Sequence, residues 1–180
     1  MIILLGKTAS GKDTIQQYLI KNYGYKKLIT YTTRPMRPGE KQNVHYHFIT
    51  EEEFYEKISH GFFLEHKVYH TEFGDWYYGS AKEDYRKADD KTIVILTPRG
   101  YLDLLWEEKG IKHDAIYIKC SIEEIKKRLL KRGDDCREAE RRIAADINDF
   151  QFVEDIVDRI VINEDKSIEE VAKEIICEEK

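Results

Sequence analysis

A glycine-rich segment near the start of the chain has residue types that can hold phosphate groups. Residues 6–12 read G-K-T-A-S-G-K and match the pattern G-x-x-x-x-G-K between an apolar run and a helical pattern. The glycines let the backbone wrap around an anion, the N–H groups and the helix N-terminus supply positive charge, and Lys12 reaches the β and γ phosphates. A glycine-rich turn with a solvated lysine is the weaker interpretation in this position. The predicted nucleotide-phosphate loop consists of Gly6, Lys7, Thr8, Ala9, Ser10, Gly11, Lys12, Asp13 and Thr14.

The residue after Lys12 departs from this pattern. A Ser or Thr hydroxyl normally holds Mg²⁺ there, whereas this chain has Asp13 followed by Thr14. A carboxylate is also a hard oxygen ligand, so Asp13 is a candidate Mg²⁺ ligand, directly or through water. An acidic residue is equally favoured in a first helical turn because it interacts with the helix dipole. Both interpretations stay open on these residues.

A second candidate anion site contains two arginines. Arg34 and Arg37 lie in the segment Y-T-T-R-P-M-R-P-G-E over residues 31–40, which its prolines hold extended. Guanidinium groups bind phosphate through paired N–H donors. Taken alone, this segment could equally be an exposed basic turn or a proline-type recognition segment.

The elements that must position these groups alternate between strand and helix. Apolar runs predict strands at residues 2–5, 92–96, 115–119 and 159–162, and helical patterns lie at about 11–23, 99–109, 121–132, 138–155 and 167–178. This order predicts an α/β fold with a doubly wound parallel sheet. Residues 31–80 break the alternation, because they are rich in aromatic residues with one short helix near residues 51–59. We interpret them as an inserted, mixed α/β lobe.

Composition narrows the class of protein. The chain has 180 residues, 41% of them hydrophobic and 36% charged, with a net charge of -5. This balance argues against a protein that holds duplex nucleic acid through a broad basic surface. The three cysteines, at positions 120, 136 and 177, have no disulfide-framework spacing, and the run at residues 1–5 is too short for a signal peptide or a membrane span. We expect a cytoplasmic protein without membrane or nucleic-acid partners, either a monomer or a homodimer.

The longer arrangement of motifs resembles the guanylate kinase family. The phosphate loop, T-T-R-P-M-R-P-G-E, V-H-Y-H-F, E-E-F, G-F-F-L-E and W-Y-Y-G-S occur in the order of that family, and the resemblance extends from residue 2 to about residue 163. It implies transfer of the γ-phosphoryl group from ATP to GMP or dGMP with Mg²⁺. It also implies one domain with a core at 1–30 and 81–180, an acceptor lobe at about 31–80 and a helical lid at about 128–142.

The resemblance assigns roles to individual residues. In the acceptor site, the residues that would hold the phosphate are Arg34, Arg37, Tyr46 and Tyr78. The residues that would lie near the base are Thr30, Glu65, Ser80 and Thr97. A carboxylate such as Glu65 accepts two N–H groups that guanine offers and adenine lacks, and Ser80 can donate to O6. The lid arginines implied are Arg128, Arg132 and Arg142, with Arg137 as an additional candidate. The implied catalytic set is Lys12, Arg34, Arg128, Arg132 and Arg142. Pairing with acidic residues or the helix dipole is the alternative for each lid arginine.

Two departures from the family pattern leave alternatives open. The stretch between Glu65 and Trp76 is a few residues longer than usual, and Thr97 stands where the family has an aspartate motif that helps with Mg²⁺ and the base. Thr97 can form hydrogen bonds but has no charge. The alternatives are a kinase for another nucleoside monophosphate, or a non-catalytic binding module for an acidic or phosphorylated peptide.

Overall fold

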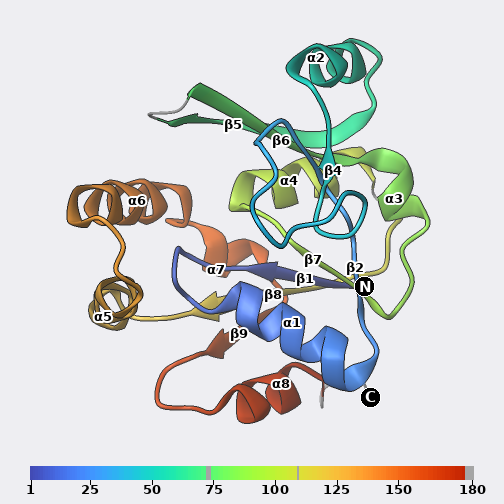
Figure 1. The fold of residues 1–180 in the computed structure, drawn as a ribbon. Coiled ribbons are helices and arrows are strands. Elements are labelled where there is room, and N and C mark those ends of the chain that lie inside the picture. The colour runs from blue at the N-terminus through green and yellow to red at the C-terminus, as the bar shows by residue number, and fades with distance from the viewer. Residues whose placement is uncertain (72–73, 109, 177–180) are drawn as a thin grey trace. The chain divides into compact units, whose positions relative to one another are not determined.

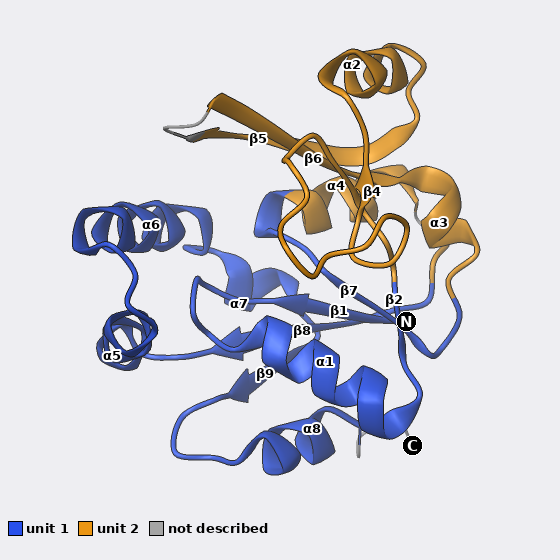
Figure 2. Cartoon of the chain, in the orientation of Figure 1, with its two compact units in different colours: residues 1–27, 89–99, 112–180 blue, residues 28–88, 100–111 orange. Residues whose placement is uncertain are grey.

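The computed structural model describes residues 1–71, 74–108 and 110–176, which form two compact units (Figures 1 and 2). Unit 1 contains residues 1–27, 89–99 and 112–180, and unit 2 contains residues 28–88 and 100–111. In the described part of the chain, no helix is long and apolar enough to cross a lipid bilayer.

Unit 1 is built around a parallel sheet with the strand order β2-β7-β1-β8-β9. Its strands are β1 (Ile2–Leu5), β2 (Lys26–Lys27), β7 (Thr92–Ile95), β8 (Asp114–Lys119) and β9 (Arg159–Ile162). Ile3 pairs with Val94 on one side of β1 and with Ala115 on the other. All four residues of β1 are buried, which explains the unbroken aliphatic run at the start of the sequence. The α/β class with a parallel sheet is confirmed.

Five helices lie entirely within the described residues of unit 1: α1 (Lys12–Tyr23), α5 (Ile122–Arg132), α6 (Cys136–Asp149), α7 (Val153–Ile156) and α8 (Ile168–Ile176). Helices α1 and α8 lie on the same side of the sheet and share a buried core that includes Leu19 and Val171 (Figure 1). Helices α5 and α6 pack through Leu129 and Ile143. Helix α4 (Pro98–Glu107) begins in unit 1 and continues in unit 2.

Some predicted element boundaries are wrong. The single helix predicted at 138–155 is two helices, because α6 ends at Asp149 and the buried ring of Phe150 stacks on Tyr117 at 5.9 Å between ring centroids. The predicted start of the last helix is confirmed, since Ser167 and Glu170 exchange hydrogen bonds. The last two residues of that prediction, 177 and 178, lie outside the described residues, as does the third cysteine.

Unit 2 has its own sheet with the order β4-β3-β6-β5. The strands are β3 (Tyr31–Thr32), β4 (His47–Phe48), β5 (Phe63–Thr71) and β6 (Gly74–Ala81). Among these described strands, only β3 and β4 pair in parallel. Strands β5 and β6 form a long hairpin, so the described residues between Glu65 and Trp76 lie in two paired strands, while 72 and 73 lie outside the described residues. Unit 2 also contains helices α2 (Glu51–Ser59) and α3 (Lys82–Arg86) and the part of α4 that follows Arg99.

Candidate active site

The loop between β1 and α1 is so tightly folded that two of its positions require glycine. A Cβ atom on Gly6 would lie 2.6 Å from Ser10 Oγ and 2.9 Å from the carbonyl oxygen of Ile118. Gly11 has φ of 96° and a Cβ there would lie 2.4 Å from Asn163 Nδ2. The loop therefore has the close backbone approach that an anion-binding turn needs.

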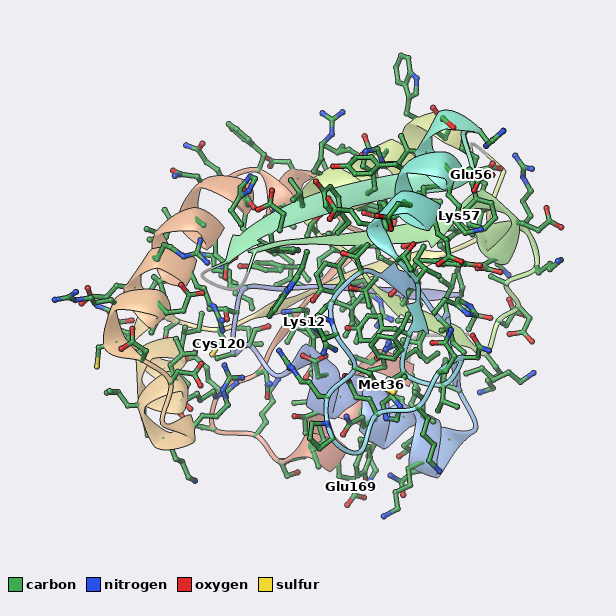
Figure 3. All side chains as sticks on the ribbon, turned by 45° about the horizontal axis from the view of Figure 1, so that its top comes forward. Lys12, Met36, Glu56, Lys57, Cys120 and Glu169 are labelled. Atoms are coloured by element: carbon green, nitrogen blue, oxygen red, sulfur yellow. The ribbon has the colours of Figure 1, made fainter. Side chains whose placement is uncertain are left out.

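The ammonium group of Lys12 lies over this loop at the start of α1 (Figure 3). Lys12 Nζ donates to the carbonyl oxygen of Lys7 at 2.8 Å and to Ser10 Oγ at 3.3 Å. Burial lowers the pKa of Lys12, although the charges of Asp13 and Asp146 oppose the shift. The cation is thus close to the N–H groups that would meet a nucleotide phosphate.

Side chains distant in sequence hold the loop in place. Asn163 Nδ2 donates to the Ser10 carbonyl oxygen at 2.8 Å. Arg128 donates through Nη1 to the Ala9 carbonyl oxygen at 3.3 Å and through Nη2 to the Asn163 carbonyl oxygen at 2.7 Å. Its Nε donates to Glu124 at 2.9 Å. Arg128, expected in the lid, therefore contacts the phosphate loop in this structure.

Asp13 and Thr14 are exposed in the first turn of α1. The negative charge of Asp13 acts on both Lys12 and Arg132. Among the described residues, no group of three or more His, Cys, Asp or Glu side chains could hold a metal ion. A metal at this loop would therefore have no more than two such side chains of the described residues as ligands.

Two of the predicted lid arginines share an acidic partner between α5 and α6. Arg132 Nε donates to Asp134 Oδ1 at 2.8 Å, and Arg142 Nη1 lies 3.8 Å from Asp134 Oδ2. The hydrogen bond from Arg132 lowers the pKa of Asp134. The structure thus places Arg132 and Arg142 together, while Arg128 lies with the loop.

Glu138, in the first turn of α6, binds two arginines of the same helix. It accepts hydrogen bonds at 2.7 Å from Arg141 Nε and from Arg142 Nε. These bonds, from Arg141 first and Arg142 next, lower the pKa of Glu138 to about 2. Arg137 is exposed on the first turn of α6.

In unit 2, Arg34 is the centre of a polar cluster. Its side chain is only 4% exposed, and its guanidinium group donates to Glu40 Oε1 at 2.7 Å and to the Pro35 carbonyl oxygen at 2.7 Å. The backbone N–H of Arg37 donates to Glu40 Oε2 at 2.7 Å, while the residue itself is exposed. One carboxylate therefore bridges a buried arginine and the backbone of a second arginine.

Two tyrosines predicted for the acceptor phosphate lie beside Arg34. The guanidinium carbon is 5.6 Å from the centroid of the Tyr46 ring, which in turn lies 6.0 Å from the Tyr78 ring. Burial disfavours the charged form of Arg34, but Glu40 and the Tyr78 hydroxyl outweigh it and raise the pKa. Thr30 precedes β3, and its carbonyl oxygen accepts from the His47 N–H group at 2.9 Å.

Glu65 and Ser80 face each other across β5 and β6. Ser80 Oγ donates to Glu65 Oε1 at 2.5 Å, and a Cβ atom on Gly100 would lie 3.3 Å from Glu65 Oε2. Burial raises the pKa of Glu65, although the Ser80 hydrogen bond favours the carboxylate. Thr97 belongs to unit 1, between β7 and α4.

The sequence interpretation gave no role to three residues that complete these clusters. Glu40 lies at the end of the same segment as Arg34, so its position could have suggested the pairing. Asn163 and Asp146 contact the phosphate loop from positions far along the chain. No motif in the sequence marks the latter two residues.

Comparison with known proteins shows one consistent family. The family model described as guanylate kinase matches residues 1–178. A guanylate kinase of Helicobacter pylori (strain ATCC 700392 / 26695) is 34% identical over 183 residues, which cover 98% of this chain and 84% of that protein. A guanylate kinase of Sulfurimonas denitrificans is 31% identical, with 96% and 83% covered.

A solved structure gives the same result for the fold. The crystal structure of guanylate kinase from Anaplasma phagocytophilum superposes with a TM-score of 0.64 and 28% sequence identity. The superposition covers 97% of this chain and 81% of the other.

Proposed function

The chain belongs to the guanylate kinase family, and from this premise we infer that it transfers the γ-phosphoryl group of ATP to GMP, giving GDP and ADP. The observation that carries the inference is the family match over residues 1–178, which includes both the phosphate loop and the Glu65–Ser80 pair. We extend the proposal to dGMP, and to a cytoplasmic monomer or homodimer.

We propose that ATP binds through residues 6–14. The loop N–H groups and the start of α1 would hold the β and γ phosphates, and Lys12 would neutralise the charge that develops on the transferred group. Arg132 and Arg142 would exchange their present carboxylate partners for phosphate oxygens when the lid closes. Arg128 supports this site through its hydrogen bond to Ala9 and would also act on the phosphates.

The acceptor phosphate would bind at Arg34, Arg37, Tyr46 and Tyr78. Arg34 is already held in one orientation by Glu40, so little conformational freedom remains to be lost on binding. Glu65 would accept the N1 and N2 hydrogens of guanine, and Ser80 would donate to O6. Thr30 and Thr97 would lie near the base as neutral hydrogen-bonding groups.

The residues of the loop fit Mg²⁺ only in part. Magnesium bound with a nucleotide takes most of its ligands from phosphates and water and one or two from carboxylates. Asp13, exposed beside Lys12, can supply one such carboxylate, directly or through water. When bound with ATP, the ion would neutralise negative charge on the β and γ phosphates.

The chemistry asks for positioning rather than for a strong base. The oxygen of GMP that attacks is already anionic, so no side chain has to remove a proton from it. Two effects would account for most of the rate enhancement. Arg34 and Arg37 would hold the acceptor in position, and Lys12 and the lid arginines would neutralise the charge of the transferred group. Closure of the lid would keep water from competing, so the enzyme should hydrolyse ATP slowly without an acceptor.

The test is ADP formation from MgATP with GMP, dGMP, AMP, CMP, UMP and dTMP as acceptors. Glu65→Ala is the informative variant, and His66→Ala, an exposed neighbour on β5, is its matched control. Turnover confined to GMP and dGMP, lost in Glu65→Ala and kept in His66→Ala, supports the proposal. Turnover with another nucleotide would instead indicate a different monophosphate kinase, and turnover with none would indicate the binding module.

A further inference from the structure

An acidic side chain of α6 occupies part of the phosphate loop. The backbone N–H of Thr8 donates a short hydrogen bond to Asp146 Oδ2, across 138 positions of the sequence. Asp146 also lies close enough to Lys12 for its charge to act on the ammonium group. A carboxylate thus contacts the loop where the N–H groups and the lysine would receive nucleotide phosphates.

This contact differs from those that hold the loop from behind. Asn163 and Arg128 donate to carbonyl oxygens of the loop and leave its N–H groups available. Asp146 instead accepts from an N–H group, which is the kind of group that binds phosphate oxygens. A bound phosphate at Thr8 would therefore meet a like charge and would have to replace the carboxylate.

On the basis of the proposed ATP site, we propose that Asp146 is a further residue of that site, an internal anion that holds the Thr8 N–H until nucleotide phosphate displaces it. It is a positioning residue, which keeps the empty loop in its binding shape and lowers its affinity for phosphates. The same helix carries Arg142, one turn before Asp146, so displacement would break a link between the loop and the helix of the proposed lid.

The direct test measures binding of inorganic pyrophosphate without Mg²⁺ by calorimetric titration. The variants are Asp146→Ala, which removes the charge and the acceptor, and Asp146→Asn, which removes the charge alone and keeps the side-chain volume. Glu140→Gln removes one negative charge from an exposed position of the same helix and is the matched control. Thermal unfolding shows whether each variant folds. If Asp146→Ala does not fold, the test is made with Asp146→Asn alone.

Pyrophosphate should bind about tenfold or more tightly to Asp146→Ala than to the wild type, because a charged hydrogen bond no longer has to be replaced. In kinetics, the KM for ATP should fall while the KM for GMP stays unchanged, and Glu140→Gln should change neither. Unchanged or weaker pyrophosphate binding in both Asp146 variants would overturn the proposal. A second result would also overturn the proposal: Asp146 variants that bind MgADP more weakly than the wild type does but bind metal-free ADP with unchanged affinity. That result would make Asp146 a metal ligand.

These outcomes are separate from a failure of the proposed function. Pyrophosphate binding reports on the loop alone and needs no acceptor nucleotide. If the wild type does not phosphorylate GMP but Asp146→Ala still binds pyrophosphate more tightly, the kinase proposal fails and the role of Asp146 stands.

Discussion

In the structure, several groups that we assign to phosphate binding already hold a carboxylate. Arg34 binds Glu40, Thr8 binds Asp146, and Arg132 and Arg142 both pair with Asp134. A cation removed from water without a partner costs free energy, so the buried guanidinium of Arg34 in particular gains from its carboxylate partner. Nucleotide phosphates would therefore exchange with protein carboxylates as well as with water.

The pairing of Glu40 with Arg34 predicts a loss of stability in Glu40→Gln. The Arg34 hydrogen bond lowers the pKa of Glu40, so the pair stabilises the fold above the ordinary pKa of 4.5, and this contribution is lost as the pH falls through the native value. We expect the free energy of unfolding at pH 7 to fall by about 1–3 kcal/mol. Urea unfolding of the variant at neutral and acidic pH measures this.

The control for that experiment is Glu56→Gln, which removes a carboxylate from an exposed position on α2 (Figure 3). It should change stability little. The difference between Glu40→Gln and the wild type should also shrink at acidic pH. A difference that stays constant from pH 7 to low pH would contradict the ionic origin of the effect.

Glu65 should behave in the opposite way. Burial raises its pKa above the ordinary 4.5, so the native state binds its proton more tightly than the unfolded chain does. The stabilising contribution is present below pH 4.5 and is lost as the pH rises through the native pKa. Glu65→Gln has no charge to bury, and we expect it to be more stable than the wild type at pH 7, with a gap that closes in acid.

The same substitution should damage the reaction. A glutamine cannot accept both guanine N–H groups, because one of its ends is a donor, so kcat/KM for GMP should fall at least about 100-fold. Steady-state kinetics test the predicted loss of activity in Glu65→Gln, and denaturation at several pH values tests its predicted gain in stability. A variant that is less stable than the wild type at pH 7 would show that burial does not dominate at Glu65.

Asp13 gives a third prediction at this scale. If it contacts the metal, Asp13→Ala should lower the apparent affinity for Mg²⁺ about tenfold, measured by titrating Mg²⁺ at saturating nucleotide. Gln17→Ala, at an exposed position one turn further along α1, is the control and should keep the wild-type requirement. An unchanged requirement in Asp13→Ala would assign the carboxylate to the helix dipole alone.

At the scale of elements, the best-marked helix in unit 2 is α2. Thr50 Oγ1 accepts from the Glu53 N–H at 3.2 Å, and the Glu53 carboxylate accepts from the Thr50 N–H at 2.8 Å. This capping box stands before a helix whose Phe54 side chain is fully buried and stacks on Phe63 at 4.5 Å. Adjacent residues therefore fix the start of the helix, and Phe63 of β5 holds its buried face.

Thr50→Ala should reduce the free energy of unfolding by about 1 kcal/mol, because one N–H at the start of α2 loses its partner. Thr50→Ser retains the hydroxyl and should stay close to the wild type. Chemical denaturation of both variants measures the effect. Equal stability of the alanine and serine variants would mean that water replaces the cap at no cost.

Elements with local signals could be predicted from the sequence, and elements set by distant packing could not. Residues close together in the sequence determine the aliphatic run of β1 and the caps of α2 and α8, so these features could be predicted. The break between α6 and α7 has no glycine or proline to mark it and depends on the packing of Phe150 on Tyr117. Strand β2 has only two lysines, so it carries no apolar pattern.

The residues of the candidate site likewise fall into those that the sequence could predict and those that it could not. Lys12, Arg34 and the Glu65–Ser80 pair lie in motifs that the sequence shows directly. The contacts of Asp146 and Asn163 with the loop depend on how the fold brings the end of α6 and of β9 to the end of β1. Periodicity and spacing cannot report such contacts, because they describe only the residues near each position.

At the scale of the whole molecule, local positive charge has to act against an acidic chain. The net charge is -5, and both substrates are anions. The loop N–H groups, the start of α1 and a few oriented arginines therefore have to supply the attraction close to the phosphates rather than over a broad surface. Substrate binding should depend on these few groups far more than on surface lysines.

The division into two units predicts how the chain unfolds. The backbone passes from one unit to the other after residues 27, 88, 99 and 111, and α4 itself crosses the boundary after Arg99. Unfolding unit 2 alone would remove most of that helix and leave both ends of the β7 segment attached to disordered chain. We therefore expect a single cooperative transition in scanning calorimetry.

A ligand that binds either unit should then raise the Tm of this single transition. At a concentration 100 times its Kd, GMP stabilises the native state by about 2.7 kcal/mol, which corresponds to a Tm increase of about 5–10 °C for a chain of this size. Pyrophosphate, which we expect at the loop of unit 1, should raise the same peak, and AMP at the GMP concentration should raise it less. Two peaks, of which GMP moves only one, would show that unit 2 unfolds independently despite the helix it shares with unit 1.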